Sequence, residues 1–179
     1  MKTHIILLLI LSMGTLFAQD KMITKTGQLV FEASVPSFEE VKAKNESVSC
    51  VLNTKTGEIA ALALQKGFRF KIALMEEHYN ENYVESDKYP KATFKGKIEN
   101  FDLSKIDKAG KSHTIKGTLE LHGKSKEISI TATIKKVDTG LEIKSDFALN
   151  ADDFNIEIPS VVSKKVSKKV NVSFNFLLK

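Results

Sequence analysis

The sequence predicts an all-β fold, an antiparallel up-and-down β-barrel with a short helix or irregular crossing around residues 75–85. Three observations predict it. Apolar and polar residues alternate along most of the chain, which is typical of strands with one dry and one solvated face. Short glycine-containing turns separate the alternating segments. One stretch instead carries bulky residues four positions apart, which is the spacing of a helical stripe.

The alternation is clearest near the carboxyl end, where one parity of the predicted strand is apolar apart from Lys168. Its apolar members are Val166, Val170, Val172, Phe174 and Phe176. The same pattern predicts strands over 29–35, 48–52, 68–74, 92–98, 115–121, 128–134 and 141–147. Successive side chains of a strand face opposite sides, so each predicted strand has one apolar face. Such a series of strands hides those faces most simply by closing into a barrel, and an open sandwich is the alternative.

The stretch without strand alternation begins at Met75. Met75, Tyr79 and Tyr83 share one helical stripe, and the helical region is disfavoured at Tyr89 because proline follows it. We therefore expect a short helix or crossing between two strands. A second, smaller cap is expected over 150–154.

Residues 1–18 have the pattern of a secretory signal peptide. Lys2 precedes a short apolar run over 5–11, and Ala18 offers a small residue at the cleavage position. The run is shorter than the about 20 apolar residues that span a bilayer, although an uncleaved anchor is the alternative. No cysteine near the cut offers a lipid attachment point. We expect residues 19–179 to form one domain in the periplasm or outside the cell.

The composition narrows the classes of partner. The net charge of +5 falls to +4 when Lys2 leaves with the leader, and acids are interleaved with the lysines. This excess is too mild to indicate nucleic-acid binding. Cys50 is the single cysteine, so an internal disulfide is excluded and the exported fold depends on packing and strand pairing.

Two motifs resemble those of the YceI-like, polyisoprenoid-binding proteins. The first runs from His78 to Phe94 (HYNENYVESDKYPKATF), and the second is Gly117–Lys126 (GTLELHGKSK). A looser match covers Phe147–Phe154 with Ile156 and Ile158. The resemblance implies a lipocalin-like barrel whose elongated apolar cavity holds an isoprenoid chain, and it covers the chain from about Gly27 onward.

The resemblance and the apolar parity together predict a ligand site in the cavity and at its mouth. Its predicted residues are Phe68, Phe70, Ile72, His78, Tyr79, Asn82, Tyr83, Tyr89, Phe94, Ile98, Leu119, Leu121, Phe147, Phe154 and Phe174. Tyrosines combine an apolar body with a polar tip, which suits a cavity entrance. The alternative is ordinary packing of these side chains in a filled small barrel. Gly96 and Gly117, both on the inward parity, remove side-chain volume or mark a strand bend.

Histidine side chains can serve in catalysis or bind metal ions. No close pair has metal-ligand spacing, and no nucleophile elbow or phosphate-binding glycine loop is present, so we expect neither a metal nor a catalytic residue. His122 is expected to form surface hydrogen bonds. His78 is expected either to donate a hydrogen bond to a ligand head group at the mouth or to fix the crossing.

These observations favour an exported carrier that holds a polyisoprenoid, an isoprenoid quinone, a polyprenyl phosphate or a fatty acyl chain, as a monomer or a homodimer. No cofactor is required, and the bound lipid is the expected partner. Lysines 164, 165, 168 and 169 suit contact with an anionic membrane surface, or they are a solvated strand edge. Two further hypotheses are a barrel enzyme or stress-response factor with His78 near the reactive head group, and a structural module without a ligand.

Overall fold

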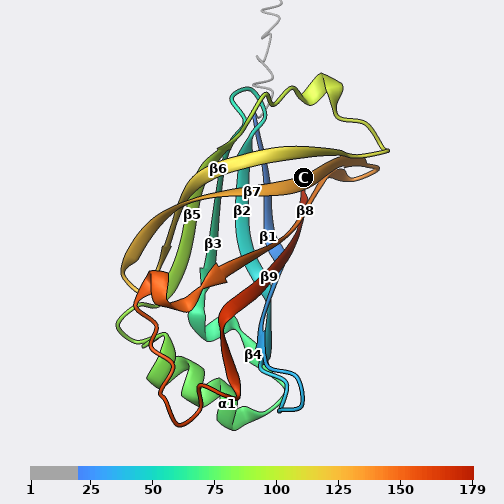
Figure 1. The fold of residues 1–179 in the computed structure, drawn as a ribbon. Helices are drawn as coiled ribbons and strands as arrows, with labels where there is room; N and C mark the ends of the chain where they lie inside the picture. The colour runs from blue at the N-terminus through green and yellow to red at the C-terminus, as the bar shows by residue number, and fades with distance from the viewer. Residues whose placement is uncertain (1–19) are drawn as a thin grey trace, which may run out of the picture.

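The computed structural model describes residues 20–179, and the predicted leader lies outside the described residues. Eight long strands each pair antiparallel with the next, and the pairing of β1 with β2 and with β9 closes the sheet into a barrel (Figure 1). The barrel strands are β1 (Lys21–Ser34), β2 (Lys42–Asn53), β3 (Glu58–Leu64), β5 (Lys91–Ile98), β6 (Lys111–Leu121), β7 (Lys124–Val137), β8 (Gly140–Asn150) and β9 (Val166–Leu178). The predicted barrel is confirmed, and the sandwich alternative is wrong.

The predicted strand over 68–74 is wrong beyond its first residues. Within this range only Arg69–Phe70 forms a strand, β4, and it pairs with β2 through Ala43 and Lys44. Ile72 is the extended residue before the helix α1 (Ala73–His78), and Leu74 is an exposed helical residue. The helix therefore begins two residues earlier than the predicted 75–85 crossing. It continues as the π-helical turn η2 (Tyr79–Tyr83), so Met75 and Tyr83 still belong to one crossing.

Short 3-10 turns complete the connections, namely η1 (Gln65–Gly67), η3 (Leu103–Lys105) and η4 (Ala151–Phe154). The last of these is the predicted small cap. In η4 the side chain of Asn150 accepts a hydrogen bond from the backbone N–H of Asp152, which satisfies a donor at the start of the turn.

Two halves of the barrel interior differ. At one end, large apolar side chains from every wall are fully buried against one another. Leu52, Ile98, Ile115, Ile134, Leu141, Ile143 and Leu178 are at most 2% exposed. Close packing of this kind supplies most of the hydrophobic stabilisation of a small domain. We call this end the filled half.

The other end is covered by segments rather than packed by the strands themselves. Figure 1 shows α1, β4, the β1–β2 loop and the segment between η4 and β9 gathered at the lower end of the barrel. This end contains the cavity described below, and we call it the hollow half. Within residues 20–179, no helix is long and apolar enough to cross a membrane.

Candidate ligand cavity

The hollow half encloses a cavity of about 380 Å³, which lies within the usual range of small-molecule sites. Its wall comes from inward residues of several strands, among them Leu29, Ala63, Leu119 and Phe147. The covering segments close it with Met75, Ile156, Ile158 and Val162. The lining is almost entirely aliphatic and aromatic, so an occupant must present an apolar surface.

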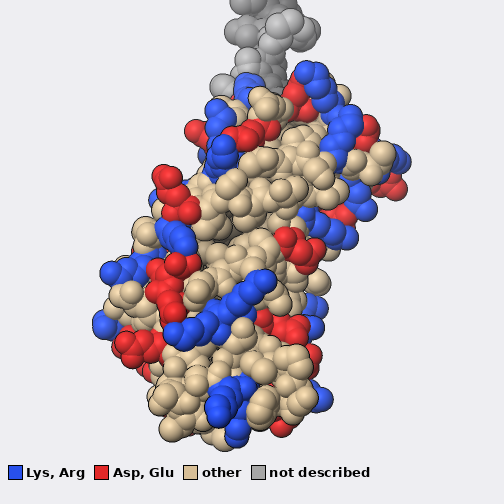
Figure 2. Space-filling view, in the orientation of Figure 1, with Lys and Arg blue, Asp and Glu red and all other residues tan. Residues whose placement is uncertain are grey.

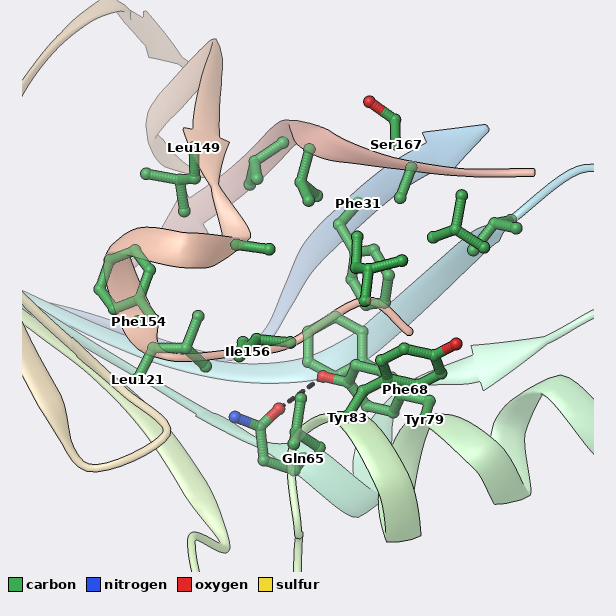
Figure 3. A pocket seen from close by; sticks show the side chains of 18 of the residues that line it. Phe31, Gln65, Phe68, Tyr79, Tyr83, Leu121, Leu149, Phe154, Ile156 and Ser167 are labelled. Atoms are coloured by element: carbon green, nitrogen blue, oxygen red, sulfur yellow. Dashed lines mark hydrogen bonds between the residues drawn. The ribbon is translucent and has the colours of Figure 1, made fainter. Parts of the chain in front are cut away.

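Four aromatic rings form one side of the cavity. Tyr79 from η2 lies among Phe31 from β1, Phe68 and Phe70, with ring centroids 5.2–5.8 Å apart. These separations are typical of favourable aromatic pairs, which hold the crossing against the barrel wall. Figure 3 shows Phe31, Phe68 and Tyr79 of this group on the side of the cavity opposite Leu121, Leu149 and Phe154.

A polar pair lies within this apolar lining. The hydroxyl of Tyr79 donates a hydrogen bond to Oε1 of Gln65 at 2.6 Å (Figure 3). Burial raises the pKa of Tyr79 far above its ordinary value, so the hydroxyl stays protonated as a donor. Gln65 is completely buried, and its Nε2 has no hydrogen-bond partner in the described structure. The pair therefore anchors the crossing to the end of β3.

Exposed polar side chains from three segments mark the mouth of the cavity. Glu39 comes from the β1–β2 loop, His78 from the end of α1, and Lys165 from the segment before β9, and all three line the cavity. Both signs of charge and a titratable imidazole are thus available to a polar head group at the mouth.

His122 joins the segments around the crossing. Its Nε2 lies 2.8 Å from the Glu85 carboxylate, and its Nδ1 lies 3.0 Å from the carbonyl oxygen of Phe154. Both partners are acceptors, so the ring satisfies both only with a proton on each nitrogen. The Tyr89 ring packs edge-on against it at 4.6 Å. The side chain is only 11% exposed, so the expected surface role of His122 is wrong.

Glu85, His122 and Asn155 adopt positive φ angles of 44°, 50° and 54°. Such backbone conformations cost non-glycine residues energy and persist where the surroundings fix them. All three lie at the junction around His122, because Asn155 follows Phe154 directly. The junction therefore fixes where the crossing and η4 sit over the hollow half.

Nine of the predicted site residues line the cavity. They are Phe68, Phe70, His78, Tyr79, Tyr83, Leu119, Leu121, Phe147 and Phe154. Their role in binding stays a prediction. The helical stripe is supported, since Met75, Tyr79 and Tyr83 all face this cavity.

The other six predicted residues lie outside the lining, for two reasons. Ile72 precedes the helix, Asn82 is exposed on η2, and Tyr89 packs on His122. Ile98, Phe94 and Phe174 do point inward, but they lie in or against the packed core. Parity identified them as interior without revealing which half of the interior they occupy.

Sequence reasoning missed several lining residues. Phe31 shares the inward parity of Leu29 and Ala33, so its position could have been found from the alternation. Ile156 and Ile158 belong to the looser motif, which could have placed them in the site, whereas Gln65 and Val162 follow no period and no sequence signal marks them. Among the described residues, no three histidine, cysteine, aspartate or glutamate side chains are grouped to hold a metal ion.

Comparisons with known proteins agree with this architecture. One similar structure is a domain of Saccharophagus degradans that is described as polyisoprenoid-binding and implicated in plant cell wall breakdown. The two structures superpose with a TM-score of 0.75 at 17% sequence identity, and the match covers 89% of this chain and 98% of that one. BcnA of Burkholderia cenocepacia gives 0.68 at 14% identity, with coverages of 84% and 94%. The Campylobacter jejuni YceI protein gives 0.63 at 18%, with coverages of 81% and 87%. These likenesses show the fold.

A comparison with curated protein sequences found no match. The model of the YceI-like domain, in contrast, matches residues 17–178, nearly the whole chain. The predicted resemblance is thereby confirmed, and the chain belongs to the YceI-like domain family.

Proposed function

We propose that this protein binds the apolar chain of a lipid in the hollow half of its barrel. The apolar cavity of about 380 Å³ is the observation that carries the proposal. A filled small barrel would have no such space. The similarity to a domain described as polyisoprenoid-binding supports an isoprenoid chain, whether a quinone tail, a polyprenyl phosphate or a related lipid, and a fatty acyl chain suits the same lining.

Affinity in this proposal comes from removing methylene groups from water, at about 0.8 kcal/mol for each buried group. The interior offers few polar partners, so chain length dominates the affinity. A polar head group stays at the mouth, beside Glu39, His78 and Lys165. The protein would serve to transport, store or protect the lipid after export to the periplasm or the exterior.

Loading of the cavity is proposed to occur at an anionic membrane surface. Three strongly exposed apolar side chains lie on the segments that cover the hollow half, with Val161 83%, Leu74 56% and Phe38 47% exposed. Lys164 and Lys165 follow Val161 and form no salt bridge with a described residue. Elsewhere on the face in Figure 2, lysines and acids are interspersed, so the attraction is local. Exposed apolar groups beside lysines suit the interface of an anionic bilayer.

Native mass spectrometry of the purified protein, followed by extraction and identification of its lipids, tests the binding proposal. We expect an adduct with the mass of an isoprenoid or acyl lipid. The variant Ala63→Leu extends a side chain into the cavity and should reduce the adduct, whereas Ala148→Leu, on the outer face of β8, should not. Absence of any adduct, with no binding of added farnesol, contradicts the proposal.

The alternative is an enzyme or stress-response factor that acts on the bound lipid. The position of His78 at the mouth is the observation that favours it. It predicts that His78→Ala abolishes turnover and leaves lipid binding intact. Equal loss of turnover and binding in this variant supports the carrier.

A further inference from the structure

The barrel interior changes character partway along two of its strands. On β5, Ala92 lines the cavity and Ile98 is completely buried in the filled half. On β9, Val172 lines the cavity and Leu178 is completely buried. Each strand has an inward phenylalanine between these two positions, Phe94 on β5 and Phe174 on β9, and both pack against the core.

Inward glycines make room for the rings at this level. A Cβ atom added to Gly96 or to Gly117 would lie 2.7 Å from the end of the Phe94 ring. A Cβ atom on Gly27 would lie 2.6 Å from the ring of Phe176. Non-bonded carbon atoms do not approach this closely, so a phenyl ring occupies the space that a side chain at each glycine position would need. The side-chain volume that Gly96 and Gly117 leave free is therefore occupied by the Phe94 ring and adds nothing to the cavity.

The rings on β9 are packed in the same region. Phe174 stacks on Phe176 with ring centroids 4.5 Å apart and an interplanar angle of 16°. Phe147, which lines the cavity from β8, meets Phe174 edge-on at 6.3 Å. Phe94, Phe174 and Phe176 thus lie between the cavity-lining and the fully buried levels of β5 and β9, and we call these three rings the aromatic floor.

We propose that the aromatic floor sets the length of the lipid chain that the cavity accepts, with Phe94 and Phe174 as the length-determining residues. The inference rests on the proposed lipid binding. A chain gains affinity with each methylene group that it buries until its end meets the floor. Beyond that length, further carbons stay outside the mouth and add nothing.

The test uses the delipidated mature protein and the series geraniol, farnesol, geranylgeraniol and longer all-trans polyprenols. Displacement of a fluorescent fatty acid gives the Kd of each. For the wild type we expect Kd to fall with each added isoprene unit, by up to about a thousandfold, because each unit buries five more apolar carbons. Once the cavity is full, Kd should stay constant within about twofold as the chain grows longer.

The variants Phe94→Ala and Phe174→Ala open the aromatic floor. The chain length beyond which Kd stays constant should therefore be longer in these variants than in the wild type. Phe94→Leu and Phe174→Leu keep more of the core packing and should give smaller shifts if the alanine variants do not fold. Phe147→Ala is the matched control, because this ring lines the cavity on the mouth side of the floor. It should weaken binding of every chain and leave the limiting length unchanged.

Two results overturn the inference while leaving lipid binding intact. One is a wild-type affinity that continues to rise through the longest polyprenol. The other is a limiting length that is the same in the floor variants as in the wild type. Failure of all alcohols in the series to bind instead contradicts the proposed function itself, and the floor with it.

Discussion

The hydrogen bond between Tyr79 and Gln65 offers a sharp test of how the crossing is held. Removing the hydroxyl in Tyr79→Phe leaves the Gln65 amide without any partner, because its Nε2 is already unpaired. A buried polar group left unsatisfied costs about 1–3 kcal/mol, so the free energy of unfolding should fall by that amount. Gln65→Met removes the unpaired nitrogen but leaves the buried Tyr79 hydroxyl without its acceptor, so it should also lower the free energy of unfolding, by up to about 3 kcal/mol.

The double variant completes a thermodynamic cycle. With both polar groups gone, the remaining site is apolar, so in the Gln65→Met background Tyr79→Phe removes an unsatisfied hydroxyl and should be neutral or stabilising. The coupling energy should therefore exceed about 1 kcal/mol. Urea unfolding followed by far-ultraviolet circular dichroism measures all four proteins, and equal m-values ensure that the midpoints are comparable.

Tyr83→Phe is the matched control for this cycle. Tyr83 lines the same cavity, and its hydroxyl makes no hydrogen bond to another described residue. Its loss should change the free energy of unfolding by less than about 0.5 kcal/mol. Additive effects of the Tyr79 and Gln65 variants would refute the reasoning, because they would mean that the two groups do not interact.

Three further predictions concern single residues. The hydrogen bond from His122 lowers the pKa of Glu85, so ionised Glu85 stabilises the fold at pH values above the ordinary glutamate pKa. This contribution is lost as the pH falls through the lowered value. The difference in urea midpoint between wild type and Glu85→Gln should therefore shrink in acid, and a difference that stays constant with pH contradicts this prediction. Burial raises the pKa of Cys50 to about 12, so a maleimide should label it only after unfolding, and rapid labelling of native protein would disprove its enclosure. Gly123 has φ +71° and lies against the Tyr89 ring, so Gly123→Ala should lower the free energy of unfolding by more than about 1 kcal/mol, and an unchanged urea midpoint would rule out this strain.

The strands were predictable where one face is dry and the other is wet. The strand β3 was missed because Ala60 and Leu62 are apolar on the parity opposite Ile59 and Ala61, which removes the period of two. The prediction over 68–74 failed for the reverse reason. Ile72 and Leu74 continue the alternation by coincidence after Phe70, although the chain has already turned into α1.

The part of the candidate site that could be predicted is the set of inward-facing strand residues, because strand parity identifies these. Parity places Leu119, Phe147 and Phe94 inside the barrel with equal force, yet only the first two line the cavity. Which level of a barrel is filled depends on how side chains from distant strands meet. The contact of Phe94 with Gly96 and Gly117 is of that kind. Aperiodic residues such as Gln65 carry no signal of burial, and only the tertiary structure reveals them.

The division of the interior has a consequence for how such a protein can change over time. Most of the largest fully buried apolar side chains lie beyond the aromatic floor, so mutations of the cavity lining leave them untouched. Proteins tolerate functional change as long as their stability stays above a threshold. The ligand specificity of such a barrel can therefore change in evolution while its fold stays stable. The same division would allow the cavity to be redesigned for a different ligand.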